Sequence, residues 1–172
     1  MIAGRFSGSV LIGQKGNLLL RKGYGKANFE LNVPNTPQTK FRISSISIQF
    51  KAMAIFQLQE GGKLQVNYLI SKYVDDILVA LNDITIHHLL THTSGIPIYY
   101  FFLEYRTYMT REISTLELID VVRNKQLHFF PGVRYKHSCS CYNILGYIIE
   151  KTSGMTYEEF LPGKFFSASA YE

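Results

Sequence analysis

The chain has 172 residues, of which 47% are hydrophobic and 18% are charged. This balance is typical of a globular domain with its own core, and it excludes an intrinsically disordered chain. The formal net charge is +5, but Lys and Arg are scattered without a basic block, so we expect a modestly basic surface and no nucleic-acid partner.

No targeting or membrane segment is recognisable. The residues after Met1 contain Arg5 and an early glycine instead of the apolar core of a signal peptide. No run approaches the roughly 18 apolar residues that span a bilayer. We therefore expect no membrane span and, by default, a cytoplasmic location. Cys139 and Cys141 are too close in sequence for a good mutual disulfide, so they do not indicate a compartment.

The N-terminal part of the sequence predicts strands. Residues 6–13 and 17–23 are rich in small and apolar side chains on either side of the turn signal QKGN, a pattern that favours a β-hairpin. Residues 26–40 contain several Asn and Pro residues and predict a loop. This part is therefore expected to contribute one hairpin and no further strand.

The rest of the sequence predicts helices. The first is expected over 45–60, where apolar residues on nearly every face indicate burial at the centre of a domain. A short helix is expected over 85–91, and a capping box opens another over 114–125. Two more are expected over 140–151 and from 156 onward, the last again behind a capping box. The elements predict an α+β fold in a single domain, residues 1–172.

Four separate stretches of the sequence stand out as a set: FSGSVLI with GYG at 6–25, FRISSIS at 41–47, ITIHHLLTHTSGIP at 84–97, and PG with LGYIIEK between 131 and 151. Together they resemble one family, the β-lactamase-related serine hydrolases, which include class C β-lactamases, penicillin-binding proteins and DD-peptidases. The resemblance extends over about residues 6–162 and implies a β-lactamase/transpeptidase-like fold, an antiparallel sheet flanked by helices. The chain would correspond to the N-terminal half, an incomplete domain without the C-terminal strands of that sheet.

The family's active site unites three motifs, and the resemblance places the first two in this chain. In Ser-x-x-Lys, the serine is Ser45, whereas the lysine that takes its proton is replaced by Ile48. In Tyr-x-Asn, the tyrosine is replaced by His137 and the asparagine by Cys139. The third motif, Lys- or His-x-Gly, would lie beyond residue 172. Another departure from the family is Ser44, which replaces the usual glycine before the serine.

Ser45 and His137 are therefore the candidate catalytic residues, each with an alternative interpretation. Ser45 is either a live nucleophile or a helix N-cap left from an active ancestor. His137 is a candidate general base in place of the missing lysine. Together with Cys139 and Cys141 it could instead bind zinc, but a fourth ligand is not evident nearby, so we expect no metal and no cofactor.

Two other patterns have plainer interpretations. Ser47 and Lys51 are four residues apart and imitate a shifted catalytic pair, but an ordinary exposed lysine is the favoured interpretation. A histidine cluster at 87, 88 and 92 suggests a metal site, but the resemblance makes these scaffold positions.

The sequence supports two main functional hypotheses. One is a serine hydrolase, impaired or inactive, that would act on β-lactams, esters or D-Ala-type peptides, including peptidoglycan-like substrates, through an acyl-serine. The alternative is a non-catalytic pseudoenzyme or binding module, or a split-gene fragment that needs a second chain. A hairpin with an unpaired edge also predicts self-association or pairing with a companion fragment.

Overall fold

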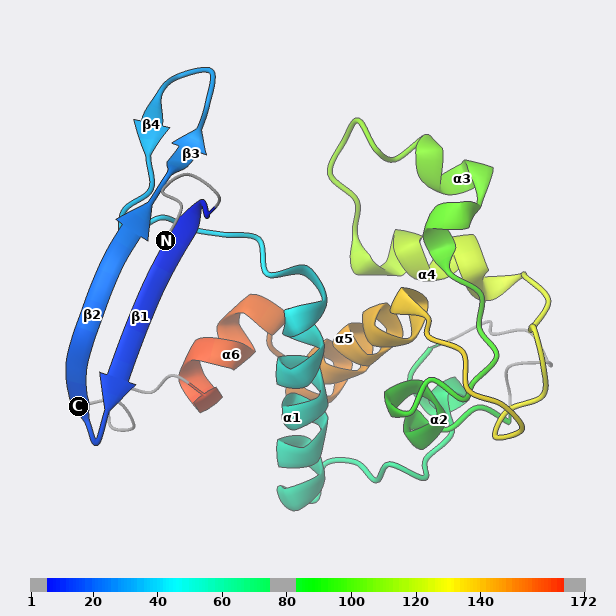
Figure 1. Ribbon diagram of the computed structural model, residues 1–172. Coiled ribbons are helices and arrows are strands. Elements are labelled where there is room, and N and C mark those ends of the chain that lie inside the picture. The colour runs from blue at the N-terminus through cyan, green and yellow to red at the C-terminus, as the bar shows by residue number, and fades with distance from the viewer. Residues whose placement is uncertain (1–5, 75–82, 166–172) are drawn as a thin grey trace. The chain divides into compact units, whose positions relative to one another are not determined.

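The computed structural model describes residues 6–74 and 83–165, and the chain forms two compact units, 1–44 and 45–172 (Figure 1). The first unit contains strands and the second contains the longer helices. Each unit is described by itself below. A single domain over 1–172 stays a prediction.

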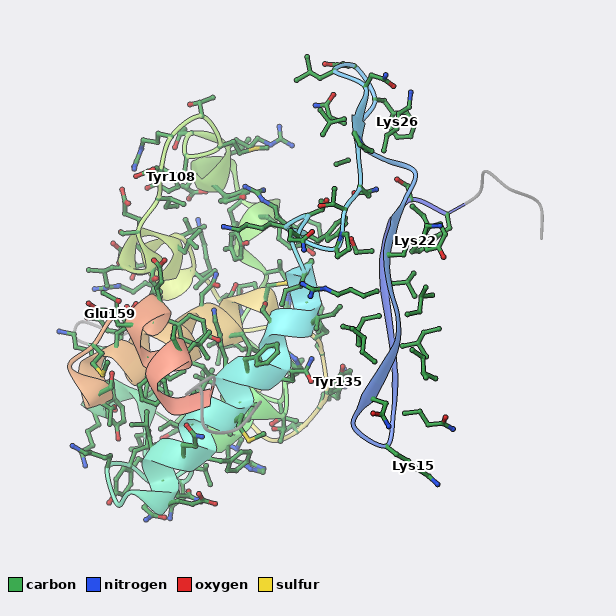
Figure 2. The ribbon with its side chains drawn as sticks, turned by 90° about the vertical axis from the view of Figure 1, so that its left-hand side faces the viewer. Lys15, Lys22, Lys26, Tyr108, Tyr135 and Glu159 are labelled. Atoms are coloured by element: carbon green, nitrogen blue, oxygen red, sulfur yellow. The ribbon has the colours of Figure 1, made fainter. Side chains whose placement is uncertain are left out.

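The first unit is built on the predicted hairpin. Strand β1 (Gly8–Gln14) pairs antiparallel with β2 (Asn17–Tyr24), from Gly8 opposite Tyr24 to Gln14 opposite Asn17. Lys15 and Gly16 form the turn with φ values of 49° and 78°, the left-handed pair that a two-residue hairpin turn requires. Lys15 is therefore at the tip of the hairpin (Figure 2).

A second, smaller hairpin lies where the sequence predicted only a loop. Strands β3 (Lys26–Asn28) and β4 (Val33–Pro34) pair antiparallel. The Asn28 side chain accepts a hydrogen bond of 2.7 Å from the Leu31 amide and so closes the turn between them. The side-chain amide of buried Asn35 donates to the Tyr24 carbonyl at 2.9 Å, which ties this hairpin to β2.

The second unit contains the helices, several of which begin where the sequence predicted. The capping boxes at Ser114 and at Thr85 are formed, and Thr156 and Glu159 exchange hydrogen bonds at the start of the last helix. Gly154, with φ of 73°, ends the longest helix. The helices are η1 (Ser44–Ile46), α1 (Ser47–Glu60), η2 (Ile70–Lys72), α2 (Ile86–Leu90), η4 (Tyr99–Phe101), α3 (Leu103–Arg106), α4 (Thr115–Arg123), α5 (Cys139–Ser153) and α6 (Tyr157–Phe165).

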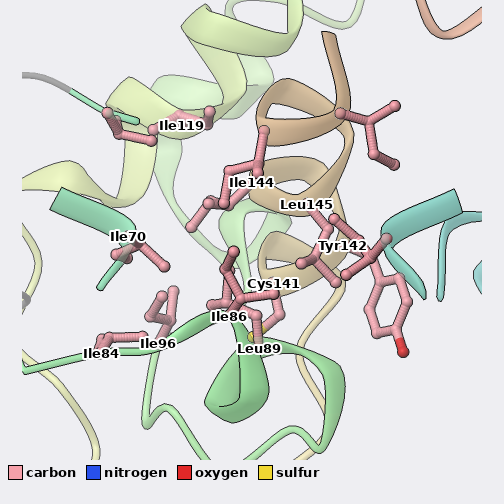
Figure 3. Packing of buried hydrophobic residues seen from close by; sticks show 14 of the residues in the cluster. Ile70, Ile84, Ile86, Leu89, Ile96, Ile119, Cys141, Tyr142, Ile144 and Leu145 are labelled. Carbon is pink, nitrogen blue, oxygen red and sulfur yellow. The ribbon is translucent and has the colours of Figure 1, made fainter. Parts of the chain in front are cut away.

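Helix α5 is the centre of this unit, because it packs against α1, α2, α4 and α6. Ile144 and Leu145 on α5 are buried with Ile86 and Leu89 of α2 (Figure 3), and Ile148 on α5 belongs to the same buried cluster. This cluster of aliphatic side chains supplies the hydrophobic burial that stabilises the unit. It also fixes the start of α5, whose first residue, Cys139, is the last residue of the second motif.

Helix α1 is less buried than its sequence predicted. Ala54, Ile55 and Leu58 are in the core, whereas Met53 and Phe56 are 54% and 46% exposed. Helix α1 packs against α5 mainly through the face that carries its buried residues, and apolar residues on its other faces remain largely exposed. In the described ranges, we find no helix with the length and apolarity that a bilayer crossing requires.

Candidate functional site

Ser45 lies where the chain enters α1. It is the middle residue of η1, it is exposed, and within the described ranges its hydroxyl has no hydrogen-bond partner. The N-cap position of α1 belongs to Ile46, which has no side-chain cap. The interpretation of Ser45 as a helix N-cap is therefore wrong. Ser45 is instead an exposed residue of η1.

The residue before Ser45 explains why the resemblance expects a glycine there. Ser44 has φ of 45°, in the left-handed region that glycine adopts at little cost. A side chain in this region costs about 1–2 kcal/mol. Ser44 adopts this left-handed conformation although it is not a glycine, so the backbone just before Ser45 is strained.

Ile48 follows Ser45 by about one helical turn. It is partly buried and packs against the hydrophobic core. A hydrocarbon side chain at this place keeps the packing of α1 but has no lone pair to accept the serine proton. The first motif therefore keeps its serine but has no proton-accepting side chain at the lysine position.

Lys51 is not the exposed lysine that the sequence predicted. Its Nζ donates a hydrogen bond of 3.1 Å to the Tyr142 carbonyl of α5 and lies 5.3 Å from the centre of the Tyr157 ring. The absent side chain of Gly146 leaves room for it, since a Cβ there would lie 3.3 Å from Nζ. Burial lowers the pKa of this lysine, and nearby Glu150 partly opposes that effect. Lys51 therefore joins α1 to α5, and the catalytic pairing with Ser47 has no support.

Replacing Lys51 with methionine is expected to stabilise the protein by about 1 kcal/mol at pH 7, because an apolar side chain of similar length removes a partly buried charge. The pKa of Lys51 is lowered in the folded state, so the unfolded chain binds more protons and stability rises with pH. The advantage of methionine should therefore vanish as the pH approaches the ordinary lysine value of 10.5. Urea unfolding at several pH values measures this difference.

The control for this substitution is Lys63→Met, at an exposed position just after α1. It should change the free energy of unfolding by less than about 0.5 kcal/mol at every pH. A Lys51→Met variant that is less stable than the native chain at pH 7 would show that the attraction of Glu150 outweighs burial.

The second motif is held against residues 97–99. Ser138 is extended, with φ of −146° and ψ of 119°, and its hydroxyl donates to the Pro97 carbonyl at 3.3 Å. The Ser140 hydroxyl donates to the same carbonyl at 2.8 Å and accepts from the Tyr99 amide at 2.9 Å. Because neighbouring side chains of an extended residue point to the opposite side, His137 is left exposed while Ser138 is buried.

The two cysteines of this region have different surroundings. Cys139 is the first residue of α5 and is partly buried. Cys141 is fully buried, its Sγ is 3.2 Å from the Ser94 hydroxyl oxygen, and burial raises the pKa of its thiol to about 11. The alternative of a zinc site with His137 is not supported, because the Cys141 thiol lies in the core whereas His137 is exposed.

The neighbouring histidines have structural roles. His88 completes the capping box of α2, because its Nδ1 accepts a hydrogen bond of 3.3 Å from the Thr85 amide. Burial lowers the pKa of His88, with His87 adding to that effect. His92 is buried and contacts the second motif. The interpretation of this cluster as scaffold agrees with these contacts.

The structure does not join the two candidate catalytic side chains directly. In the described part of the chain, no hydrogen bond or ring contact links Ser45 to His137. One contact between the helices that follow them is the hydrogen bond of Lys51 on α1 to the Tyr142 carbonyl on α5, six residues after Ser45, or about 9 Å along a helix at 1.5 Å per residue. A cavity of about 440 Å³ lies elsewhere, along residues 125–131. The pairing of Ser45 with His137 therefore remains a proposal.

Comparisons with known proteins agree on one family. A family profile described as Beta-lactamase matches residues 2–168. Protein flp of Staphylococcus aureus strain COL is 33% identical over 89% of this chain and 31% of its own length. The putative penicillin-binding protein PbpX of Bacillus subtilis strain 168 is 34% identical over 94% of this chain and 39% of its own. The chain thus spans about a third of the length of these curated relatives.

A solved structure is similar over nearly the whole chain. The octameric penicillin-binding protein homologue from Pyrococcus abyssi is 34% identical and superposes with a TM-score of 0.77. The similarity covers 92% of this chain and 37% of that one. The likeness confirms the expected β-lactamase/transpeptidase-like fold over a part of a larger domain.

Proposed function

The chain belongs to the beta-lactamase family, and we propose that it retains that family's acyl-transfer site at Ser45 with reduced activity. The hydroxyl oxygen of Ser45 would attack the carbonyl carbon of a β-lactam, an ester or a D-Ala-type peptide and form an acyl-serine ester. The leaving group takes the hydroxyl proton, and water then hydrolyses the ester and restores Ser45. The observation that carries this proposal is that Ser45 is exposed at the entrance to α1 and that its hydroxyl has no partner among the residues that the structure describes.

His137 is the proposed proton acceptor in place of the missing lysine. It is exposed at the position of the family's tyrosine, just before α5. Imidazole accepts a proton near neutral pH, which a phenol or an isoleucine does not readily do. This route requires the exposed His137 side chain and Ser45 to approach each other when substrate binds.

Hydrolysis of a small chromogenic ester tests this function. Ser45→Ala should abolish turnover, and His137→Ala should lower it about 10²-fold, the usual contribution of a general base. Cys139→Ser is the control for hydrolysis by the nearby thiol and should leave the rate unchanged. Full activity in Ser45→Ala would overturn the proposal, and full activity in His137→Ala would remove only the role of His137.

A non-catalytic binding module is the second candidate, and Ile48 favours it. The apolar side chain of Ile48 packs on the core at the position where the family has its lysine base. Such a site would bind a penicillin or a peptidoglycan-like peptide without consuming it. Binding by calorimetry in the absence of any acyl-serine would support this candidate against the hydrolase.

We also propose that the protein self-associates through its first unit. In the described residues, β1 and β2 form a two-stranded sheet, and Leu11, Leu18 and Leu19 on it are exposed. Open strand edges beside apolar side chains favour pairing with another chain. The Pyrococcus abyssi homologue is described as octameric, which supports this proposal. A single monomeric species in sedimentation at high concentration would contradict it.

A further inference from the structure

His92 has an unusual combination of burial and backbone conformation. It directly follows the C-terminal turn of α2, is 8% exposed, and has φ of 56° in the left-handed region. For a residue other than glycine this conformation is strained, and burial of the imidazole adds the free-energy cost of removing it from water. Surrounding contacts must therefore hold it in place.

Those contacts converge on the second motif. The His92 carbonyl accepts a hydrogen bond of 2.9 Å from the Lys136 amide, and its Nδ1 accepts one of 3.3 Å from the Ser138 amide. The two bonds bracket His137, the residue between those donors. One histidine therefore satisfies the backbone donors on both sides of the candidate base.

The ring of His92 completes this arrangement. Its centre lies 4.5 Å from the centre of the His137 ring and 5.2 Å from that of Tyr142 on α5. Tyr135 meets it edge-on at 6.1 Å. The imidazole thus lies among side chains of the motif segment and of α5.

We propose that His92 is a positioning residue, which fixes the segment 136–138 and thereby sets where His137 stands relative to α5. This inference rests on the proposed function, in which His137 serves Ser45. The role depends on the tautomer, since Nδ1 can accept from Ser138 only while it carries no proton. The proton of the neutral ring is therefore on Nε2, and a second proton would break this bond.

The surroundings of His92 favour its neutral form. Burial lowers its pKa, and the neighbouring His137 lowers it further. The other titratable groups around it are Tyr135 and Lys136 on the motif segment and Tyr142 on α5. The segment should accordingly be held at neutral pH and released in acid, when His92 gains its second proton.

Hydrogen exchange at the Ser138 amide, measured by NMR, tests this role with two variants. His92→Phe keeps a buried ring but has no acceptor, whereas His92→Asn has an oxygen near the place of Nδ1 and tolerates the left-handed backbone. We expect exchange at Ser138 to be about tenfold faster in His92→Phe and near the native rate in His92→Asn. Equal rates in the native chain and His92→Phe, or equally fast exchange in both variants, would overturn the role.

The native protein provides a second measurement that requires no variant. A long-range proton–nitrogen spectrum should show His92 with an unprotonated Nδ1 and a protonated Nε2 at pH 7. Exchange at Ser138, corrected for its intrinsic pH dependence, should lose protection as the pH falls through the pKa of His92. The His92→Asn variant should keep its protection over the same range. A protonated Nδ1 at pH 7, or protection that does not change in acid, would overturn the inference.

These readouts do not depend on catalysis. If Ser45 proves unreactive while Ser138 exchange responds as expected, the proposed function fails and the positioning role stands. If Ser45 reacts while the exchange rate of the Ser138 amide is the same in the native chain and in the His92 variants, only the positioning role fails.

Discussion

Replacing Ile48 with lysine is expected to raise the rate of Ser45 acylation by at least about 10³-fold, the lower end of what losing a base from such a unit costs. Ile48 lies about one turn beyond Ser45, so a lysine amine at this position can reach the hydroxyl. The position is partly buried, and partial burial disfavours the charged ammonium, which favours the neutral amine that accepts the serine proton. Covalent labelling by a fluorescent penicillin measures the rate.

Two controls make this experiment specific. Ile48→Met has a side chain of similar length without an amine, and it should change the acylation rate less than about threefold. Ile48→Lys combined with Ser45→Ala should not be labelled at all. A folded Ile48→Lys variant that reacts no faster than the native chain would show that positions 45 and 48 do not act as a nucleophile and its base.

Gly95→Ala is expected to destabilise the protein by at least about 3 kcal/mol, through both backbone strain and overpacking. Gly95 has φ of 78°, and a Cβ there would lie 2.2 Å from the Phe129 carbonyl oxygen, a contact that backbone atoms cannot relieve cheaply. The Gly95 carbonyl also accepts a hydrogen bond of 2.9 Å from the His128 amide. Shifting this contact would move the neighbouring Pro97, whose carbonyl holds the second motif.

Gly154→Ala is the matched control for the clash. Gly154 has φ of 73°, but a Cβ there would meet nothing within 4 Å. It should therefore cost only the conformational strain, about 1 kcal/mol. Urea unfolding of both variants gives the comparison, and equal losses would mean that the contact with Phe129 does not constrain the fold.

Local signals in the sequence predicted much of the secondary structure. The QKGN turn fixed the first hairpin, and the capping box at Ser114 placed the start of α4, because both depend on residues within four positions of each other. The hairpin β3–β4 was missed, since its Asn and Pro residues are also typical of loops. The Leu31 amide closes its turn by donating to the Asn28 side-chain oxygen, a contact that composition alone does not reveal.

The candidate site was predictable only where a motif identified the residue. The family resemblance located Ser45 and His137, but the burial of Lys51 depends on a contact with Tyr142, 91 residues away in sequence. Likewise, Cys141 is buried against Ser94 because α5 packs on α2. The sequence predicts only a scaffold role for His92. Its place between the end of a short helix and Thr-Ser-Gly is a sign of a turn, in which His92 has a left-handed backbone. Such long-range contacts arise from tertiary packing, which periodicity does not encode.

The family assignment and the reactivity of Ser45 are separate questions, because a fold does not by itself imply an activity. Mass spectrometry of the folded protein after exposure to a fluorophosphonate addresses the second question directly. We expect one adduct per chain, located on Ser45 and absent from Ser45→Ala. An adduct on another residue, or no adduct on a protein that remains folded, would contradict it.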